Sequence, residues 1–222
     1  MDNKVNNALE AGVATYASLE NIESTEFLSA LKTTFALEAP FMTKVGAMDT
    51  VFDNHQSFEE LRELSFDLLM INFFAEDVQK LEEDYLDSEE WEQIEEDTLD
   101  RGTELLNVFL YLKECADDEI EADLDDYLKE FLLVEEDEFQ DEHRIYEKVI
   151  ANQILVESDY SEIDNVAKTV GPLEELYELF NPVVSFFYEQ NPSSQQIEEF
   201  TSHAENKAYE TALYQVIVNF NK

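Results

Sequence analysis

The feature that most constrains the fold is a strongly acidic stretch, residues 76–142, in which apolar residues recur at helical spacing. It holds 29 acidic side chains (17 Glu and 12 Asp) against the four basic residues Lys80, Arg101, Lys113 and Lys129, a net charge of −25 in 67 residues. Disordered acidic segments are poor in aromatic and branched apolar residues, whereas Leu, Ile, Phe, Trp and Tyr recur throughout this one. We therefore expect helices that bury one apolar face and present an anionic remainder.

The composition of the whole chain favours long helices. Of its 222 residues 44% are hydrophobic, with 16 Phe and 10 Tyr, which is enough for a substantial core. Gly and Pro number only four each, and β-sheet proteins need frequent turns that are rich in both. The sequence predicts an all-α fold, a bundle of seven to nine helices with no sheet. Residues 1–222 would form a single domain, or two closely packed lobes with residues 76–142 in the middle.

Apolar spacing predicts the individual helices. Residues 57–74 become apolar nearly all round, so this helix should lie at the centre of the bundle. Gly102 should bend or break the helix predicted over 88–114, and residues 41–56 lack periodicity and are predicted to be mainly loop. The predicted helices cover residues 4–19, 24–39, 57–74, 88–114, 119–138 and 139–157, followed by short helices from 161, 172 and 182 and a last helix over 193–218.

Short polar motifs predict where helices begin. Ser57-Phe58-Glu59-Glu60 has the form of a capping box, in which the Ser hydroxyl and the Glu carboxylate each satisfy a free backbone N–H. Asp87-Ser88-Glu89-Glu90 predicts a second start. Further starts are predicted at Ser161, Pro172, Pro182 and Pro192-Ser193-Ser194, because proline is well placed in the first turn of a helix.

The total charge needs an explanation. The chain carries 54 acidic and 13 basic residues, a net charge of −41, and self-repulsion of this size lowers stability. Adaptation to high salt is one explanation, but Glu outnumbers Asp by 36 to 18 and Phe is abundant, whereas salt-adapted proteins favour Asp and small residues. A dedicated anionic surface and an ordinary solvated surface both remain open.

Patterns for catalysis and metal binding are weak. A ferritin-like di-iron site needs Glu three residues before His, and His55, His143 and His203 lack it. Two carboxylate patterns would suit magnesium: Asp117-Asp118-x-x-Glu121, and Glu92-x-x-Glu95 followed by Glu114-x-x-Asp117. Both come without the basic groups that would hold substrate phosphates. We expect a protein that is not an enzyme and has no cofactor or metal site. A magnesium-dependent all-α hydrolase is kept as an alternative.

The remaining interpretation is a surface for a cationic partner. A helix over 119–138 would carry ten acidic residues in about 30 Å, roughly one per 3 Å of axis, and duplex DNA carries one charge per about 1.7 Å. With the 88–114 helix beside it, the two rows would approach the charge density of DNA. The candidate partner-binding residues are Glu89, Glu90, Glu92, Glu95, Glu96, Asp97, Asp100, Asp117, Asp118, Glu119, Glu121, Asp123, Asp125, Asp126, Glu130, Glu135, Glu136, Asp137 and Glu138.

In character this acidic block resembles the helical DNA-mimic proteins that occupy DNA-binding grooves, such as phage inhibitors of restriction enzymes. The resemblance is one of composition and covers the middle third of the chain best. It implies a non-enzymatic inhibitor that binds the basic groove of a nuclease or another nucleic-acid-binding protein. Direct nucleic-acid binding is not expected, because phosphate contacts need basic patches.

Other expectations concern alternative partners and location. A helical adaptor or chaperone-like module that binds an apolar segment is an alternative, motivated by Phe186, Phe187 and Tyr188, and an exposed Phe-rich face could form a homodimer. The lone Cys115 excludes an intramolecular disulfide and favours a reducing compartment. Residues 1–4 lack the basic and apolar start of a secretory signal, and no apolar run is long enough to span a bilayer. We expect a cytoplasmic protein without membrane contact.

Overall fold

The computed structural model describes residues 1–76, 78–81, 83–131 and 145–222, and of these all side chains except those of residues 78, 79, 83, 130 and 131. Within these residues the chain forms 13 α-helices and no strand. The predicted all-α class is therefore confirmed, although the helices are more numerous and shorter than the seven to nine predicted.

The α-helices are α1 (Asn3–Glu20), α2 (Thr25–Phe35), α3 (Phe41–Asn54), α4 (Arg62–Glu76), α5 (Glu83–Leu86), α6 (Glu89–Asp97), α7 (Leu105–Asp117), α8 (Leu124–Asp126), α10 (Glu147–Ala151), α11 (Tyr160–Ala167), α12 (Phe180–Tyr188), α13 (Ser194–His203) and α14 (Lys207–Asn221). The 3-10 helices are η1 (Gln56–Leu61), η2 (Val78–Leu81) and η4 (Gln153–Glu157), and η3 (Tyr127–Phe131) is a π-helical turn.

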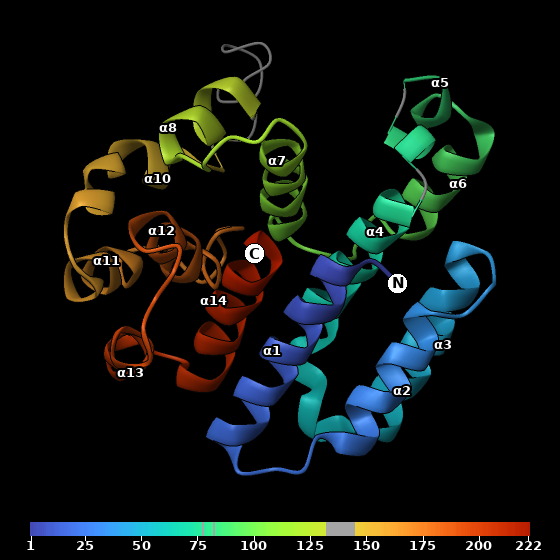
Figure 1. Cartoon of the computed structure of the whole chain (residues 1–222), viewed down its shortest axis with the longest axis horizontal. Helices are drawn as coiled ribbons and strands as arrows, with labels where there is room; N and C mark the ends of the chain where they lie inside the picture. The colour runs from blue at the N-terminus through green and yellow to red at the C-terminus, as the bar shows by residue number, and fades with distance from the viewer. Residues whose placement is uncertain (77, 82, 132–144) are drawn as a thin grey trace.

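The antiparallel helices α1 and α14 form the middle of the molecule, with α2–α4 on one side and α11–α13 on the other (Figure 1). Gly12 permits their close approach, because a Cβ at this position would lie 2.4 Å from Cγ2 of Val216. Lys4 Nζ donates to the carbonyl oxygens of Phe220 and Asn221, each at 3.4 Å. The first helix therefore satisfies the last carbonyls of the final one.

Helix α4 is buried nearly all round, as its composition predicted. All residues from Leu64 to Asn72 are buried. The predicted start of this helix at Ser57 is wrong, because residues 56–61 form η1 and the Ser57 side chain makes no capping hydrogen bond. Phe58 instead stacks on Phe27, with ring centroids 4.0 Å apart, and this contact fixes the turn that precedes α4.

Residues 41–54 form helix α3, so the prediction of a loop over 41–56 was wrong. Phe41, Val45, Met48 and Phe52 are buried along one side of the helix. They recur at steps of four, three and four residues, which is the spacing of an amphipathic helix. The polar and small residues between them obscured that pattern.

The long helices predicted in the middle of the chain are broken. Gly102 has a positive φ of 78°, a conformation that favours glycine, and it separates α6 from α7 as predicted. The predicted helix over 119–138 was wrong in its first turn, because Glu119 has a φ of 57° and α8 begins only at Leu124. Residues 132–138 lie outside the described part of the chain.

Other predicted boundaries also change. Residues 171–179 form turns in place of the helix predicted after Pro172, and Leu173 is 98% exposed. The helix predicted over 139–157 is α10 and η4, and its residues up to 144 lie outside the described part. The last predicted helix is divided at Ala204 into α13 and α14, and α13 begins with a complete capping box at Ser193.

Candidate anionic interaction surface

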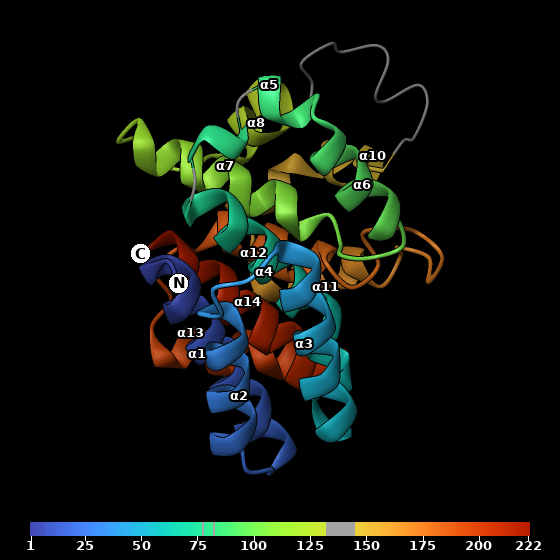
Figure 2. The same cartoon turned by 90° about the vertical axis from the view of Figure 1, so that its right-hand side faces the viewer.

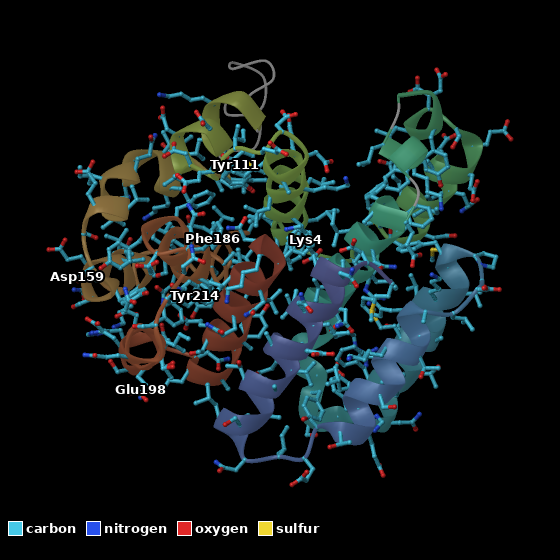
Figure 3. All side chains as sticks on the ribbon, in the orientation of Figure 1. Lys4, Tyr111, Asp159, Phe186, Glu198 and Tyr214 are labelled. Atoms are coloured by element: carbon cyan, nitrogen blue, oxygen red, sulfur yellow. The ribbon has the colours of Figure 1, made fainter. Side chains whose placement is uncertain are left out.

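The described residues of the acidic block, up to residue 131, form short helices and turns at one end of the molecule. Helices α5, α6, α7 and α8 lie together toward this end in two perpendicular views (Figures 1 and 2). Oxygen-tipped side chains point outward there, and the labelled Glu198 on α13 lies away from these helices (Figure 3). The name anionic end is used below for two groups of exposed acidic residues. The first group is those of α6 together with Asp100, and the second is those within residues 117–126.

Helix α6 is held by a small apolar face. Ser88 caps it by accepting a hydrogen bond from the Trp91 backbone N–H at 3.2 Å. Ile94 is buried, and the Trp91 ring lies 5.3 Å from that of Phe74 in α4. These contacts fix one side of the helix and leave the other sides to solvent.

The exposed sides of α6 are acidic and have no countercharge within the described residues. None of the seven carboxylates makes an ion pair or a hydrogen bond there, and all seven residues are exposed. Acidic groups in the first turn are favourable near the positive end of the helix dipole, whereas those in the last turn are unfavourable. The residues are Glu89, Glu90, Glu92, Glu95, Glu96, Asp97 and Asp100.

The charge density of α6 is close to that of a nucleic acid. Six acidic residues occupy its nine positions, which span about 13 Å at 1.5 Å per residue. That is about one carboxylate per 2 Å of axis, compared with one phosphate per about 1.7 Å in duplex DNA.

The second acidic group lies in the turn between α7 and α8. The Tyr111 hydroxyl fixes this turn by donating to the Asp123 carbonyl at 3.0 Å and accepting from the Asp123 N–H at 2.9 Å. The Asp123 side chain caps α8, while Asp117 pairs with Lys113 at 2.8 Å and Asp125 with Lys129 at 2.6 Å. Three of the predicted acidic residues are thus engaged within the chain.

Four other acidic residues of this segment are exposed and unpaired within the described residues, namely Asp118, Glu119, Glu121 and Asp126. Ile120, which lies between Glu119 and Glu121 in the sequence, is 54% exposed. The side chain of Glu130 and the whole of Glu135, Glu136, Asp137 and Glu138 lie outside the described part.

The two acidic rows do not lie side by side as predicted. Helices α6 and α8 are on opposite sides of α7 (Figure 1). The break at Gly102 and the non-helical turn before Leu124 turn both segments away from a straight rod. The predicted pair of parallel acidic helices is therefore corrected to two separate acidic patches at the same end.

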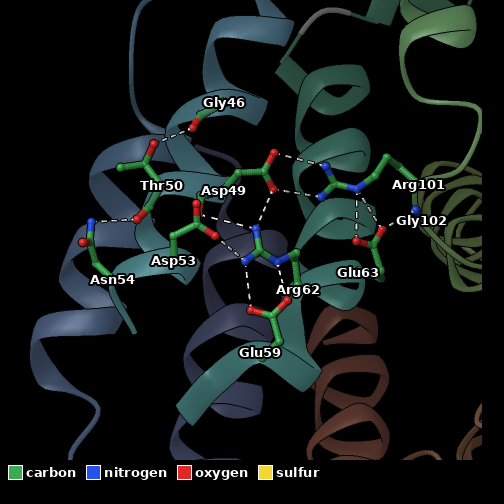
Figure 4. A network of polar contacts seen from close by, with 10 residues as sticks. All are labelled: Gly46, Asp49, Thr50, Asp53, Asn54, Glu59, Arg62, Glu63, Arg101 and Gly102. Carbon is green, nitrogen blue, oxygen red and sulfur yellow. Dashed lines mark hydrogen bonds and ion pairs between the residues drawn. The ribbon is translucent and has the colours of Figure 1, made fainter. Parts of the chain in front are cut away.

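Arg101 anchors the chain between α6 and α7 to α3 and α4, and Arg62 of α4 shares the same network through Asp49 (Figure 4). Arg101 donates from Nε to Glu63 at 3.0 Å and from Nη2 to Asp49 at 3.2 Å. Arg62 donates to the same Asp49 at 3.0 Å and to Glu59 at 2.7 Å. These two of the 13 basic residues are therefore ion-paired within the chain. Asp49 and Arg101 are far apart in the sequence and meet only in the folded protein.

The same connection contains a buried carboxyl group. Asp67 is 1% exposed and accepts hydrogen bonds from the Thr103 N–H at 2.9 Å and hydroxyl at 2.6 Å. Burial raises the pKa of Asp67 to about 8, against the opposing effect of these hydrogen bonds. Gly102 lies directly beside it, since a Cβ there would be 2.7 Å from Oδ1 of Asp67.

The structure also shows where the residues lie that suggested the alternative functions. Phe186 and Phe187 are buried, and Phe187 stacks on Tyr127 at 5.7 Å, so both belong to the core. Cys115 is buried, and burial raises the pKa of its thiol.

In the described residues no three His, Cys, Asp or Glu side chains come close enough together to hold a metal ion. The magnesium hydrolase stays a prediction without a located site.

No protein-family model, curated protein or solved structure matches this chain. Within the described residues, no helix has both the length and the apolar character needed to cross a membrane.

Proposed function

We propose that the protein is a non-enzymatic binding protein whose anionic end attaches to a basic surface of another protein. The observation that supports this most is the set of seven exposed carboxylates from Glu89 to Asp100 without a countercharge in the described part of the chain. A complementary potential steers association and selects partners, and its effect falls as salt rises.

The energetics of α6 support the same proposal. Glu95, Glu96 and Asp97 crowd the last turn of the helix, where the helix dipole disfavours negative charge by about 0.3–1 kcal/mol per group. A cationic partner would convert this unfavourable interaction into a favourable one.

In its narrower form the proposal names the partner as a nuclease or other nucleic-acid-binding protein, whose basic groove accepts α6 in place of DNA. The axial charge density of α6 supports it, because a groove that neutralises phosphates about 1.7 Å apart also suits carboxylates at about 2 Å spacing. The separation of α6 from α8 implies that α6 is the element that enters the groove.

The experiment is a competition assay with purified DNA-binding proteins and a fluorescent DNA duplex. The wild-type chain should displace the duplex from at least one of them, and displacement should weaken steeply between 50 and 200 mM salt. The triple variant Glu92→Gln, Glu95→Gln, Glu96→Gln should lose this competition.

A matched control changes the same number of charges away from α6. Glu23, Glu26 and Glu198 are exposed and unpaired within the described residues, and their replacement by Gln should preserve competition. The proposal fails if both triple variants compete equally, or if displacement is independent of salt.

A further inference from the structure

A groove of about 560 Å³ lies away from the anionic end, between the end of α1, α11, α12 and the beginning of α14. Five carboxylate side chains and two lysines line it, together with asparagine and tyrosine side chains. One lysine, Lys168, is paired with Asp164 at 2.5 Å. The lining therefore has an excess of negative charge.

The floor of the groove is preorganised by a buried hydrogen-bond network. Glu210 is 8% exposed and accepts from Asn181 Nδ2 at 2.6 Å and from the Asn206 backbone N–H at 2.7 Å. The Ser185 hydroxyl in turn donates to Oδ1 of the Asn181 side chain at 3.3 Å. Both oxygens of Glu210 are thus engaged, and this carboxylate holds the lining in place.

Tyr209 differs from these groups because its hydroxyl has no hydrogen-bond partner in the part of the chain that the structure describes. The residue is 4% exposed and lines the groove, and its hydroxyl makes no hydrogen bond to any described residue. Burial raises the pKa of Tyr209, and the surrounding carboxylates of Glu178, Asp67, Glu60 and Glu63 raise it further. Without a protein partner among the described residues, this hydroxyl can form a hydrogen bond with a ligand in the groove.

Glu178 also lines the groove and has no ion pair or hydrogen bond within the described residues. Glu178 is exposed, and partial desolvation, followed by the nearby carboxylate of Glu60, raises its pKa. Glu60 itself accepts a hydrogen bond from the Tyr16 hydroxyl at 3.0 Å. A positively charged group in the groove would relieve the repulsion between these carboxylates.

We propose that this groove binds an alkylammonium group, with the Glu178 carboxylate as its charge partner and the Tyr209 hydroxyl oxygen as a hydrogen-bond acceptor. An ammonium group has three donors and no acceptor, which matches a site of carboxylate and phenol oxygens. The group could belong to a free polyamine or to a lysine side chain of a protein. The inference is independent of the anionic end, because none of the residues of that surface lines the groove.

The test is NMR of the intact chain with ¹³C-labelled tyrosine rings, titrated at 150 mM NaCl with spermidine or with the peptide acetyl-Gly-Lys-Gly-amide. Saturable shifts confined to Tyr177 and Tyr209 are expected. Saturation by spermidine alone assigns the site to a free polyamine, and saturation by the peptide assigns it to a lysine side chain.

Three variants decide the roles of the residues. With Tyr177 as the reporter, Tyr209→Phe and Glu178→Gln should each weaken binding by about 10-fold. Glu175→Gln removes an exposed charge from the same segment outside the groove and should change affinity by less than about 2-fold. Circular dichroism would confirm that each variant is folded.

Two results would overturn the proposal. One is a non-saturating shift spread over all ten tyrosines, which is the behaviour of diffuse counterions. The other is equal affinity in the wild type, Tyr209→Phe and Glu178→Gln.

Discussion

The replacement Asp67→Asn should remove a specific pH dependence of stability. Asn is nearly isosteric with Asp, and it can accept from the Thr103 N–H and donate to the Thr103 hydroxyl, so both contacts seen at 2.9 and 2.6 Å can be kept. The carboxyl group of Asp67, in contrast, is buried beside Glu63 and Glu104, and its pKa is raised to about 8.

The sign of the effect follows from proton linkage. An unfolded Asp has a pKa of about 3.9, so the folded state holds an extra proton between about pH 4 and pH 8. The stabilisation linked to the protonated carboxyl group is fully present below pH 4 and is lost as pH rises through 8. The loss is about 1.4 kcal/mol per pH unit, or about 2.7 kcal/mol between pH 5 and pH 7.

Urea denaturation of wild type and Asp67→Asn at pH 5, 6 and 7 measures this effect. Because other groups titrate equally in both proteins, the informative quantity is the difference between their free energies of unfolding. The wild type should lose stability relative to the variant as pH rises. A difference that stays constant over this range would refute the placement of Asp67 as a buried, protonated carboxyl group.

Four further substitutions test the fold and the surface by chemical denaturation. Gly102→Ala should cost about 1–3 kcal/mol because its φ is positive, whereas Gly46→Ala, which has no atom within 4 Å of the added Cβ, should stabilise α3 by about 0.5–1 kcal/mol; equal effects would contradict the assigned backbone. Leu128→Ala should cost about 2–5 kcal/mol because Leu128 is buried, and a neutral result would place it at the surface. Asp97→Asn should stabilise the protein by about 0.3–1 kcal/mol at low salt through the α6 dipole, with the gain shrinking as salt is added.

The sequence predicts those features that depend on neighbouring residues. The burial of α4 follows from its all-round apolar pattern, the Ser88 cap from its motif, and the break at Gly102 from the conformational freedom of glycine. These signals are local, so the rest of the fold does not alter them.

Features that depend on distant residues were missed. The turn before Leu124 is set by the Tyr111 hydroxyl, twelve residues from Asp123, and no periodicity in residues 119–138 reveals it. Arg101 looked like a rare basic residue in an acidic block, although Glu63 and Asp49 engage it across the fold. The groove around Tyr209 also joins segments that are far apart in the sequence.

The acidic composition correctly located the exposed charge on α6, but it did not determine the relative placement of the acidic segments. The predicted parallel rows assumed two straight helices, and the positive φ values at Gly102 and Glu119 prevent that arrangement. The narrower form of the proposed function therefore depends on the charge of α6 and not on a pair of parallel helices.

The most direct test of the central claim is a residue-by-residue measurement of surface potential by NMR, from the relaxation caused by a cationic and by a neutral nitroxide probe. The account predicts that the ratio of cationic to neutral enhancement is largest at the amides of Glu89–Asp97 and residues 117–126, and several-fold smaller along α2 and α13. A ratio that is uniform over the surface would contradict the claim that uncompensated negative charge is gathered at one end of the molecule.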